Sequence, residues 1–324
     1  MNILVTGGAG YIGSHLVKIL SKSPHSITVL DNLSRGHIES VPPGVGFEKI
    51  NLLDKIALAD LFTRKKIDAI IHFAAFAYVG ESVENPGLYY ENNVVGSYNL
   101  IEAARTAGVL KFVFSSTCSL YGNPEQMPIR EDFKTGPLNP YAWTKLIIEQ
   151  VLRDYDTAYG VKSVCLRYFN AAGASFDGDI GESHDPEPHL IPIILDAAFG
   201  KREFVSVFGT DYPTPDGTCI RDYIHILDLA DAHIRALNYL EEGRESNIIN
   251  LGTGEGNSVM DVIEKCRKIT GRNINVKIGP RRAGDPAILV ADNRKAKEVL
   301  GWEPKYNIEQ TIESAWKWRL NPKY

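Results

Sequence analysis

The most informative stretch of this chain is Thr6-Gly7-Gly8-Ala9-Gly10-Tyr11-Ile12-Gly13, which places glycines at positions 7, 10 and 13. Glycines at this spacing let the backbone approach a pyrophosphate, and the N-terminus of a following helix offers it unpaired N–H groups and positive potential. Three glycines alone are a weak signal, because glycine-rich turns are common. Here they follow an apolar run and precede apolar residues at helical spacing, which is the context that such a site requires. We therefore predict that a dinucleotide binds at this turn.

Outward from this turn, short apolar runs alternate with helical periodicity through the first half of the chain. The expected strands cover residues 3–6, 26–30, 46–50, 69–73, 111–115 and 163–167. They are apolar nearly throughout, as are strands buried on both faces of a parallel sheet. This pattern predicts an α/β fold, a Rossmann-type doubly wound parallel sheet, with a smaller C-terminal α/β domain that binds the substrate.

A carboxylate, Asp31, closes the second expected strand, eighteen residues after Gly13. There it can accept hydrogen bonds from both hydroxyls of a ribose, and it would repel a 2′-phosphate. This favours NAD over NADP as the cofactor. Arg35 nearby keeps NADP open as an alternative. Asp31 could also be a plain turn residue at the end of the strand, with no role in binding.

Tyr141 and Lys145 stand four residues apart at the expected start of a helix after Pro140, so they share one helical face. A tyrosine with a pKa near 10 is a poor base at neutral pH, but a neighbouring ammonium and a nicotinamide cation both favour the phenolate. Ser116 and Thr117 end the fifth expected strand, where a hydroxyl could hydrogen-bond the substrate oxygen that loses its proton. A tyrosine and a lysine four residues apart are common by chance. In a chain that also has a dinucleotide-binding turn and these strand-end hydroxyls, the pair predicts proton transfer next to a nicotinamide.

Length, charge and cysteine usage exclude several other classes of protein. The 324 residues exceed the ~100–200 of a usual domain, which predicts two domains or one enlarged one. The 35 Lys and Arg residues against 40 Asp and Glu residues form no basic block, so we expect neither nucleic acid nor a membrane as a partner. The four cysteines form no CxxC pair, and we expect reduced thiols and no metal site. With no leader or membrane segment visible, we expect a cytoplasmic protein.

The character of the chain changes near residue 171. Residues 171–189 are rich in Gly, Asp, Glu and Pro and indicate a long loop, either a binding element or a surface insertion. Further on, Ser258 and Asn307 resemble helix N-caps and Gly271 a helix stop. We expect a dinucleotide domain of residues 1–170 plus about 217–252, which return to its sheet, and a substrate domain of about 171–216 plus 253–324.

Over its whole length the chain resembles the extended short-chain dehydrogenase/reductase family and, within it, the UDP-glucose 4-epimerases. Besides the glycine turn and the Tyr141/Lys145 pair, the motifs that carry the resemblance are Asp31-Asn32, His72-Phe73-Ala74-Ala75, Val79-Gly80-Glu81-Ser82, Asn92-Asn93, Ser115-Ser116-Thr117, Tyr121-Gly122, Arg167-Tyr168-Phe169-Asn170, Arg221-Asp222-Tyr223-Ile224-His225 and residues 281–285.

The resemblance implies a reaction and its catalytic residues. Tyr141 would take the proton of the sugar's 4-hydroxyl while hydride leaves C4 for NAD, and the 4-keto sugar would turn and receive the hydride on its other face. Lys145 would hold the ribose and tune Tyr141, and Thr117 would orient the oxygen. The other cofactor contacts that the resemblance implies are Gly7, Gly10, Tyr11, Ile12, Gly13, Asp31, Asn32, Asn51, Leu52, Phe73, Ala74, Ala75, Ala77, Asn93, Ser115 and Phe169.

The resemblance also implies how a UDP-sugar binds. Arg221 and Arg282 would grip the phosphates, because a planar guanidinium suits paired oxygens. Besides Thr117 and Tyr141, the further implied contacts are Asn170, His189, Leu190, Ser206, Phe208, Tyr223, Asp285 and Leu289.

The chain departs from the family at four positions. Ala77 stands where a lysine often contacts the cofactor, and Asn51 replaces a usual aspartate near the adenine. His189 stands where an asparagine often contacts the nucleotide sugar. Leu289 matches a position whose size is linked to admitting N-acetylated sugars, and leucine is intermediate. An epimerase of UDP-N-acetylglucosamine and UDP-N-acetylgalactosamine, or of UDP-xylose and UDP-arabinose, therefore stays open.

Two other readings are weaker. A nucleotide-sugar 4,6-dehydratase needs an acid and a base after the strand-end hydroxyl, where this chain has Cys118 and Ser119. A dinucleotide-sensing module without catalysis would not need an intact Tyr141 and Lys145.

The resemblance also implies a homodimer, formed by residues 90–107 and 142–158.

Overall fold

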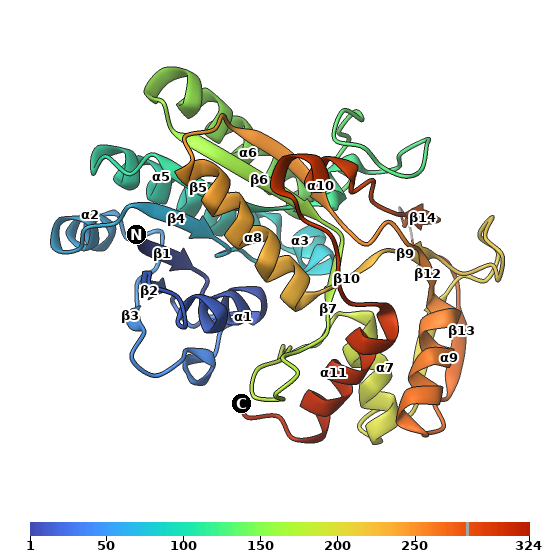
Figure 1. Ribbon diagram of the computed structural model, residues 1–324. Coiled ribbons are helices and arrows are strands. Elements are labelled where there is room, and N and C mark those ends of the chain that lie inside the picture. Colours follow the sequence, from blue (N-terminus) through green and yellow to red (C-terminus); the bar gives the residue numbers. More distant parts are fainter. Residues whose placement is uncertain (283–284) are drawn as a thin grey trace. The chain divides into compact units, whose positions relative to one another are not determined.

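The computed structural model describes residues 1–282 and 285–324. In it, a seven-stranded sheet combines six strands from residues 2–168 with one from residues 247–251 (Figure 1). The strand order is β11-β6-β5-β4-β1-β2-β3, and the pairs β1·β2, β1·β4, β2·β3 and β4·β5 are parallel. From β1 the sheet grows to one side through β2 and β3 and then to the other through β4, which is the doubly wound order. The predicted fold class is confirmed. The strands are β1 (Asn2–Thr6), β2 (Ser26–Leu30), β3 (Gly46–Glu48), β4 (Ala69–His72), β5 (Lys111–Thr117), β6 (Lys162–Tyr168) and β11 (Asn247–Leu251).

Helices cover both faces of this sheet. On one face, apolar side chains of α2 (Lys55–Arg64), α5 (Gly96–Thr106) and α6 (Pro140–Tyr159) share one buried cluster with the strands, as the near-continuous apolar runs require. On the other face lie α1 (Tyr11–Leu20) and α8 (Ile226–Glu241) (Figure 1). Three short helices lie between β4 and α5: α3 (Val79–Glu84), α4 (Pro86–Tyr89) and the π-helical η2 (Tyr90–Val95). Two others, η1 (Ile38–Ser40) and η3 (Cys118–Tyr121), follow β2 and β5.

The second half of the chain forms a smaller α/β assembly with its own buried cluster. Helices α7 (Leu190–Phe199), α9 (Val259–Thr270) and α11 (Ile308–Leu320) supply most of that cluster, and α10 (Arg294–Leu300) precedes α11. Its short strands pair as β7 (Asn170–Ala172) with β10 (Tyr223–His225), as β8 (Val205–Phe208) with β13 (Val276–Gly279), and as β12 (Asn257–Ser258), β9 (Ile220–Arg221) and β14 (Ile288–Leu289) in one sheet.

The helix ends follow the capping signals in the sequence. The Ser258 hydroxyl accepts a hydrogen bond from the Asp261 N–H at the start of α9, and Gly271 ends that helix in the left-handed region at φ 63°. Asn307 and Gln310 form a capping box before α11. These three predictions are confirmed, because each needs only residues a turn apart.

The chain divides into two compact units. The first contains Met1–Tyr121, Thr135–Arg167 and Ala230–Ile249, and the second Gly122–Lys134, Tyr168–Leu229 and Asn250–Tyr324. As expected, a segment from late in the chain returns to the seven-stranded sheet, where it forms strand β11. Four segments that were expected in the first unit lie in the second: residues 122–134, 168–170, 217–229 and 250–252. The bridge of Ile129 to Ala291 holds the first of these there. The third contains β9, which pairs with β12, and β10, which pairs with β7.

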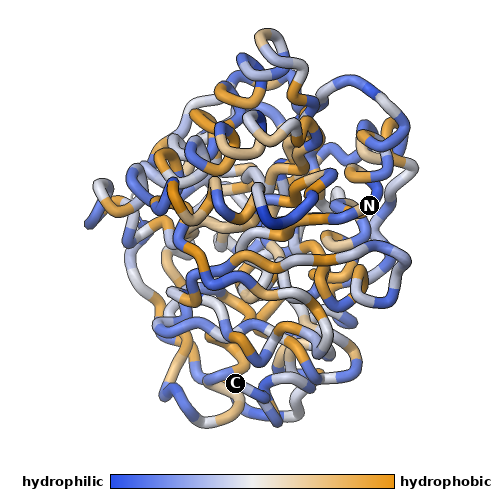
Figure 2. Tube along the Cα trace, turned by 90° about the vertical axis from the view of Figure 1, so that its left-hand side faces the viewer, coloured by the Kyte–Doolittle hydropathy of each residue, from blue (hydrophilic) through white to orange (hydrophobic). Residues whose placement is uncertain are grey.

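Hydropathy follows this architecture. Figure 2 shows that hydrophobic and hydrophilic stretches alternate along the whole trace. Among residues 1–282 and 285–324, no helix is long and apolar enough to span a bilayer. The four cysteines are buried, and none of them forms a disulfide.

Candidate active site

The turn between β1 and α1 is built so closely that only glycine fits at two of its positions. Gly7 has φ +70°, and a Cβ there would lie 2.6 Å from the backbone nitrogen of Ala74. A Cβ on Gly13 would lie 2.3 Å from the carbonyl oxygen of Gly7. Gly10 is the N-cap of α1 and offers no capping side chain, so the first amides of the helix, at Tyr11 and Ile12, point toward the turn. The geometry fits the pyrophosphate of a dinucleotide, which needs close backbone approach and helix N–H groups.

Asp31 lies beside this turn, directly after β2. Its carboxylate accepts hydrogen bonds from the Ala9 N–H at 3.1 Å and the Leu33 N–H at 2.9 Å. Burial raises the pKa of Asp31, and these backbone donors oppose the rise. Each carboxylate oxygen has a second lone pair, so the ribose hydroxyls can still donate to it. Asn32 follows it and accepts a hydrogen bond from the Ser34 N–H.

Arg35, which kept an NADP site open, is held by other groups. Its Nη2 donates to both oxygens of Glu81, at 2.7 and 3.0 Å, and its guanidinium lies 4.6 Å from the ring centroid of Tyr78. A guanidinium with a bidentate carboxylate partner has lost much of its positive field. The pairing therefore favours NAD, which lacks the 2′-phosphate that Arg35 would otherwise attract.

The loop after β4 forms the next part of the predicted cofactor site. Phe73 packs on His233 with ring centroids 4.6 Å apart, and Ala74, Ala75 and the exposed Ala77 follow it. Asn93 is buried, and its side-chain amide exchanges hydrogen bonds with the backbone of Phe76, at 2.8 and 2.9 Å. Asn93 thus holds this loop in shape. In the earlier connection from β3 to α2, Asn51 is exposed, and the carbonyl of the buried Leu52 accepts a hydrogen bond from the Asn99 side chain.

The predicted catalytic pair lies at the start of α6. Asn139 caps this helix through the Ala142 N–H and Pro140 occupies its first turn, so the sequence itself sets where it begins. Tyr141 is 7% exposed and Lys145 is 4% exposed. The Lys145 Nζ donates to the carbonyl of Ser115, on β5, at 2.7 Å. Burial lowers the pKa of Lys145 from its ordinary 10.5 to about 7, and the charge of Glu149 opposes that fall.

The two hydroxyls at the end of β5 have different partners. Successive residues of a strand point to opposite faces, so Ser116 and Thr117 cannot both serve one substrate. The Ser116 Oγ donates to the Glu149 Oε1 at 2.5 Å. Thr117 accepts from the Ser119 N–H at 3.2 Å, which leaves its O–H available as a donor. Ser116 is therefore a structural residue, and Thr117 keeps the orienting role as a prediction.

Glu149 is a residue of this region that sequence reasoning missed. Its side chain is fully buried and accepts hydrogen bonds from Arg167 at 2.9 and 2.6 Å as well as from Ser116. It stands four residues after Lys145, one helical turn further along the same face. That spacing is the signal that could have found it.

In the second unit, the implied UDP-sugar contacts form two groups. In one, the Arg282 guanidinium lies 4.0 Å from the ring centroid of Phe208 on β8, two residues after Ser206. In the other, Arg221 on β9 forms an ion pair with Asp285, and Leu289 on β14 is its register partner. Asn170 and Tyr223 are register partners on β7 and β10. Ala283 and Gly284, inside the motif of residues 281–285, lie outside the described residues.

The remaining implied contacts also lie in the second unit. Phe169 is buried, and its N–H donates to the carbonyl of Leu251. Leu190 is the first residue of α7, and His189 is its N-cap. The His189 Nδ1 lies 2.6 Å from the Glu182 Oε1, a partner that the sequence analysis did not include. Burial alone would lower the pKa of His189, but the negative charges of Glu182 and Glu187 beside its ring raise it to about 10.

Comparisons with known proteins agree with this geometry. The model of the NAD dependent epimerase/dehydratase family matches residues 3–252. A UDP-glucose 4-epimerase of Rhizobium meliloti is 54% identical, over 98% of this chain and 96% of the relative, and one of Halalkalibacterium halodurans is 52% identical, over 98% and 95%. The crystal structure of UDP-glucose 4-epimerase from Brucella ovis in complex with NAD is 47% identical, covers 97% of each chain and has a TM-score of 0.94. The chain therefore belongs to the NAD dependent epimerase/dehydratase family.

Proposed function

We propose that this protein is an NAD-dependent 4-epimerase that interconverts UDP-glucose and UDP-galactose. The observation that carries the proposal is the set of Tyr141, Lys145 and Thr117 at the adjoining ends of α6 and β5, beside a turn that fits a dinucleotide. Relatives named UDP-glucose 4-epimerase, 54% and 52% identical over nearly the whole chain, support it.

The residues of the first unit would hold NAD and move one proton. The glycine turn and the N-terminus of α1 would bind its pyrophosphate, and Asp31 would accept from a ribose. Bound NAD would supply the acceptor for a hydride from C4 of the sugar and the donor for its return to the opposite face. Tyr141 would take the proton of the 4-hydroxyl and give it back, and Thr117 would donate a hydrogen bond to the same oxygen. The Lys145 ammonium would stabilise the phenolate form of Tyr141.

The residues of the second unit would bind the UDP. Arg221 and Arg282 supply two guanidinium groups, each already oriented by a neighbour, Asp285 or Phe208. A formal net charge of −5 does not oppose binding of a doubly anionic ligand, because the field at a site depends on its nearest charges. Leu289, the register partner of Arg221 on the neighbouring strand, would also contact the UDP-sugar.

We further propose that the protein is a homodimer that works in the cytoplasm in galactose metabolism. Apolar side chains are exposed along the stretches expected to pair. Val95 and Tyr98 on η2 and α5 are 45% and 42% exposed, and Trp143 on α6 is 46% exposed. Exposed apolar groups on adjacent helices are typical of subunit interfaces. A monomer by light scattering at micromolar concentration would contradict the dimer.

The test of the proposed reaction is direct. Purified protein incubated with UDP-galactose and no added NAD should form UDP-glucose, read by chromatography of the nucleotide sugars. Parallel incubations with UDP-N-acetylgalactosamine and UDP-xylose distinguish the related epimerases. A 4,6-dehydrated product would replace the proposal with a dehydratase, and no conversion by NAD-loaded protein of any of these sugars would end it.

Tyr141→Phe tests the proton-transfer residue. It should lower turnover by about 10²–10⁴-fold, the usual contribution of a positioned acid or base, while NAD content stays unchanged. Tyr159→Phe is the matched control, because Tyr159 lies on the same helix and is 52% exposed. Equal turnover of the two variants would show that Tyr141 is not the base.

A further inference from the structure

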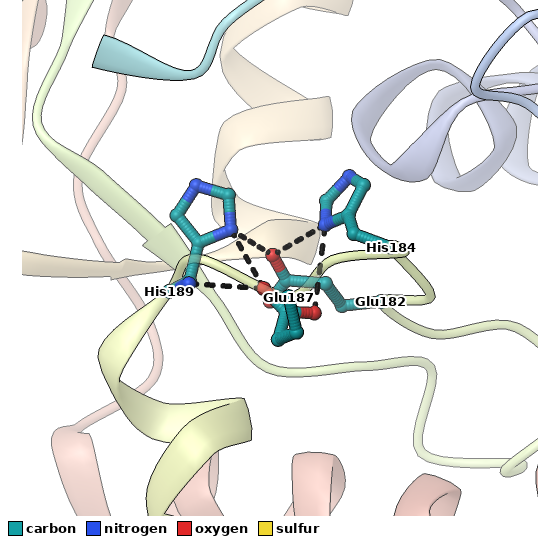
Figure 3. A group of neighbouring side chains, drawn as sticks. All are labelled: Glu182, His184, Glu187 and His189. Atoms are coloured by element: carbon teal, nitrogen blue, oxygen red, sulfur yellow. Dashed lines mark hydrogen bonds and ion pairs between the residues drawn. The ribbon is translucent and has the colours of Figure 1, made fainter. Parts of the chain in front are cut away.

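Four side chains with metal-binding atoms converge in the segment before α7, within the second unit (Figure 3). They are Glu182, His184, Glu187 and His189, and each offers one ligand atom, all within 4.8 Å of one another. The reaction proposed above has no use for the first three. The expectation of no metal site rested on cysteine spacing, which does not test a set of histidines and glutamates.

The distances between these atoms are those of a small coordination sphere. The Glu182 Oε1 lies 2.6 Å from the His189 Nδ1 and 3.2 Å from the His184 Nδ1. A Glu187 oxygen lies 3.1 Å from the His189 Nδ1, and the other lies 3.6 Å from the His184 Nδ1. Ligands about 2.1 Å from a tetrahedral zinc ion are about 3.4 Å from one another, so small side-chain adjustments would bring all four to that spacing.

Burial gives this cluster a reason to hold a cation. The side chains of Glu182 and Glu187 are only 5% and 6% exposed, and that of His184 is 15% exposed. No donor among residues 1–282 and 285–324 makes a hydrogen bond of ordinary geometry to the Glu182 Oε1, despite the two imidazoles beside it. A buried carboxylate oxygen without such a bond is costly unless a charge compensates it. Two carboxylates match the charge of one divalent cation, and each imidazole binds the ion after releasing its ring proton to solvent.

We propose that Glu182, His184, Glu187 and His189 bind one Zn²⁺ ion, through the Nδ1 of each imidazole and one oxygen of each carboxylate. Imidazole and carboxylate donors in a set of four suit zinc, and four protein ligands make a closed, structural site. The ion cross-links both ends of the segment of residues 182–189. It thereby fixes the chain that leads into Leu190 and α7.

The protein stripped with a chelator and then dialysed against ZnCl₂ tests this assignment. Metal analysis should find one zinc per chain, and calorimetric titration of the stripped protein with ZnCl₂ should give the same stoichiometry. Zinc should raise the midpoint of thermal unfolding, because a ligand that binds only the folded state stabilises it. Cobalt in place of zinc should give the visible absorption of a tetrahedral site.

Matched variants locate the site. His184→Gln with His189→Gln should lose the stoichiometric zinc and the thermal shift, and Glu187→Gln, which keeps its shape, should weaken binding at least tenfold. His25→Gln is the control, because His25 and the N-terminal amine, 3.3 Å apart, form the competing place for a metal. Its zinc content should equal that of the unaltered protein.

Three results would overturn the proposal: no retained zinc, equal zinc content in the double variant, or loss of zinc in His25→Gln alone. The first would leave these residues as an ion-paired cluster only. Circular dichroism and NAD content of each variant show whether it folds. Metal content is read without substrate, so the outcome does not depend on the reaction proposed above.

Discussion

The buried ion pair of Glu149 and Arg167 should carry a large share of the stability of the first unit. Its side chains are 0% and 4% exposed, and Arg167 donates to both carboxylate oxygens and to the Tyr121 hydroxyl. Glu149→Gln removes the charge and one acceptor but keeps the size. The guanidinium of Arg167 then stays buried without a counter-charge, which is the expensive outcome for such a pair.

The size of the effect follows from that geometry. Breaking a buried pair by removing one partner costs about 3–5 kcal/mol. The amide keeps one oxygen for the Ser116 hydroxyl or for Arg167, so we expect the lower end, about 3 kcal/mol. A loss of that size lowers the midpoint of thermal unfolding by about 6–12 °C. Replacing both partners, as Glu149→Leu with Arg167→Met, should cost less than the sum of the two single changes, since no charge is left buried.

The assay is urea and thermal unfolding followed by circular dichroism. Asp132→Asn is the control, because the Arg130–Asp132 pair has the same chemistry but side chains 51% and 61% exposed. Solvent screens such a pair, and we expect no measurable change. A Glu149→Gln protein as stable as the Asp132→Asn protein would refute the reasoning that burial makes the first pair important.

Three other changes test the site. Gly13→Ala should abolish NAD retention, because its Cβ would meet a backbone oxygen at 2.3 Å. The control Gly87→Ala, whose Cβ would have nothing within 4 Å, should retain NAD. Equal NAD content in the two variants would contradict the binding of the pyrophosphate at the glycine turn. Glu81→Gln should release Arg35 and improve NADP binding relative to NAD by up to about tenfold, measured by fluorescence titration. An unchanged ratio of the two affinities would show that Arg35 is too far from the 2′-phosphate of NADP to bind it. Burial lowers the pKa of Lys145 from 10.5 to about 7, so between those pH values the unfolded chain holds a proton that the folded protein has lost, and stability rises with pH. Lys145→Met should flatten that rise in urea unfolding from pH 7 to 9, and a rise as steep as before would disprove it.

Local signals predicted much of the fold because they need only neighbouring residues. The apolar runs located six strands of the sheet, and Asn307 and Gly271 act where their spacing placed them. The apolar runs were less accurate at the strand ends, since β5 continues through Ser116 and Thr117, beyond the run of residues 111–115. Polar residues can extend a strand when buried partners satisfy them, as Glu149 does for Ser116.

Long-range pairing explains what could not be predicted. Gly122–Lys134 lies in the second unit because the Ile129 N–H finds its acceptor on Val290, a choice that no nearby residue announces. Likewise, Arg35 suggested an NADP site until its partner Glu81, 46 residues later, was placed beside it.

The sequence by itself determined the doubly wound sheet, the glycine turn and the position of Tyr141 and Lys145 on one helical face. Each follows from steric and periodic rules within a few residues. Only the tertiary structure decided which groups share a charge or a proton: Glu149 with Arg167, Glu81 with Arg35, and the two histidines with Glu182 and Glu187. Electrostatic partners depend on distance and burial in space. Separation along the chain gives neither of these, whether the residues are far apart in sequence, as Arg35 and Glu81 are, or near, as Glu182 and His184 are.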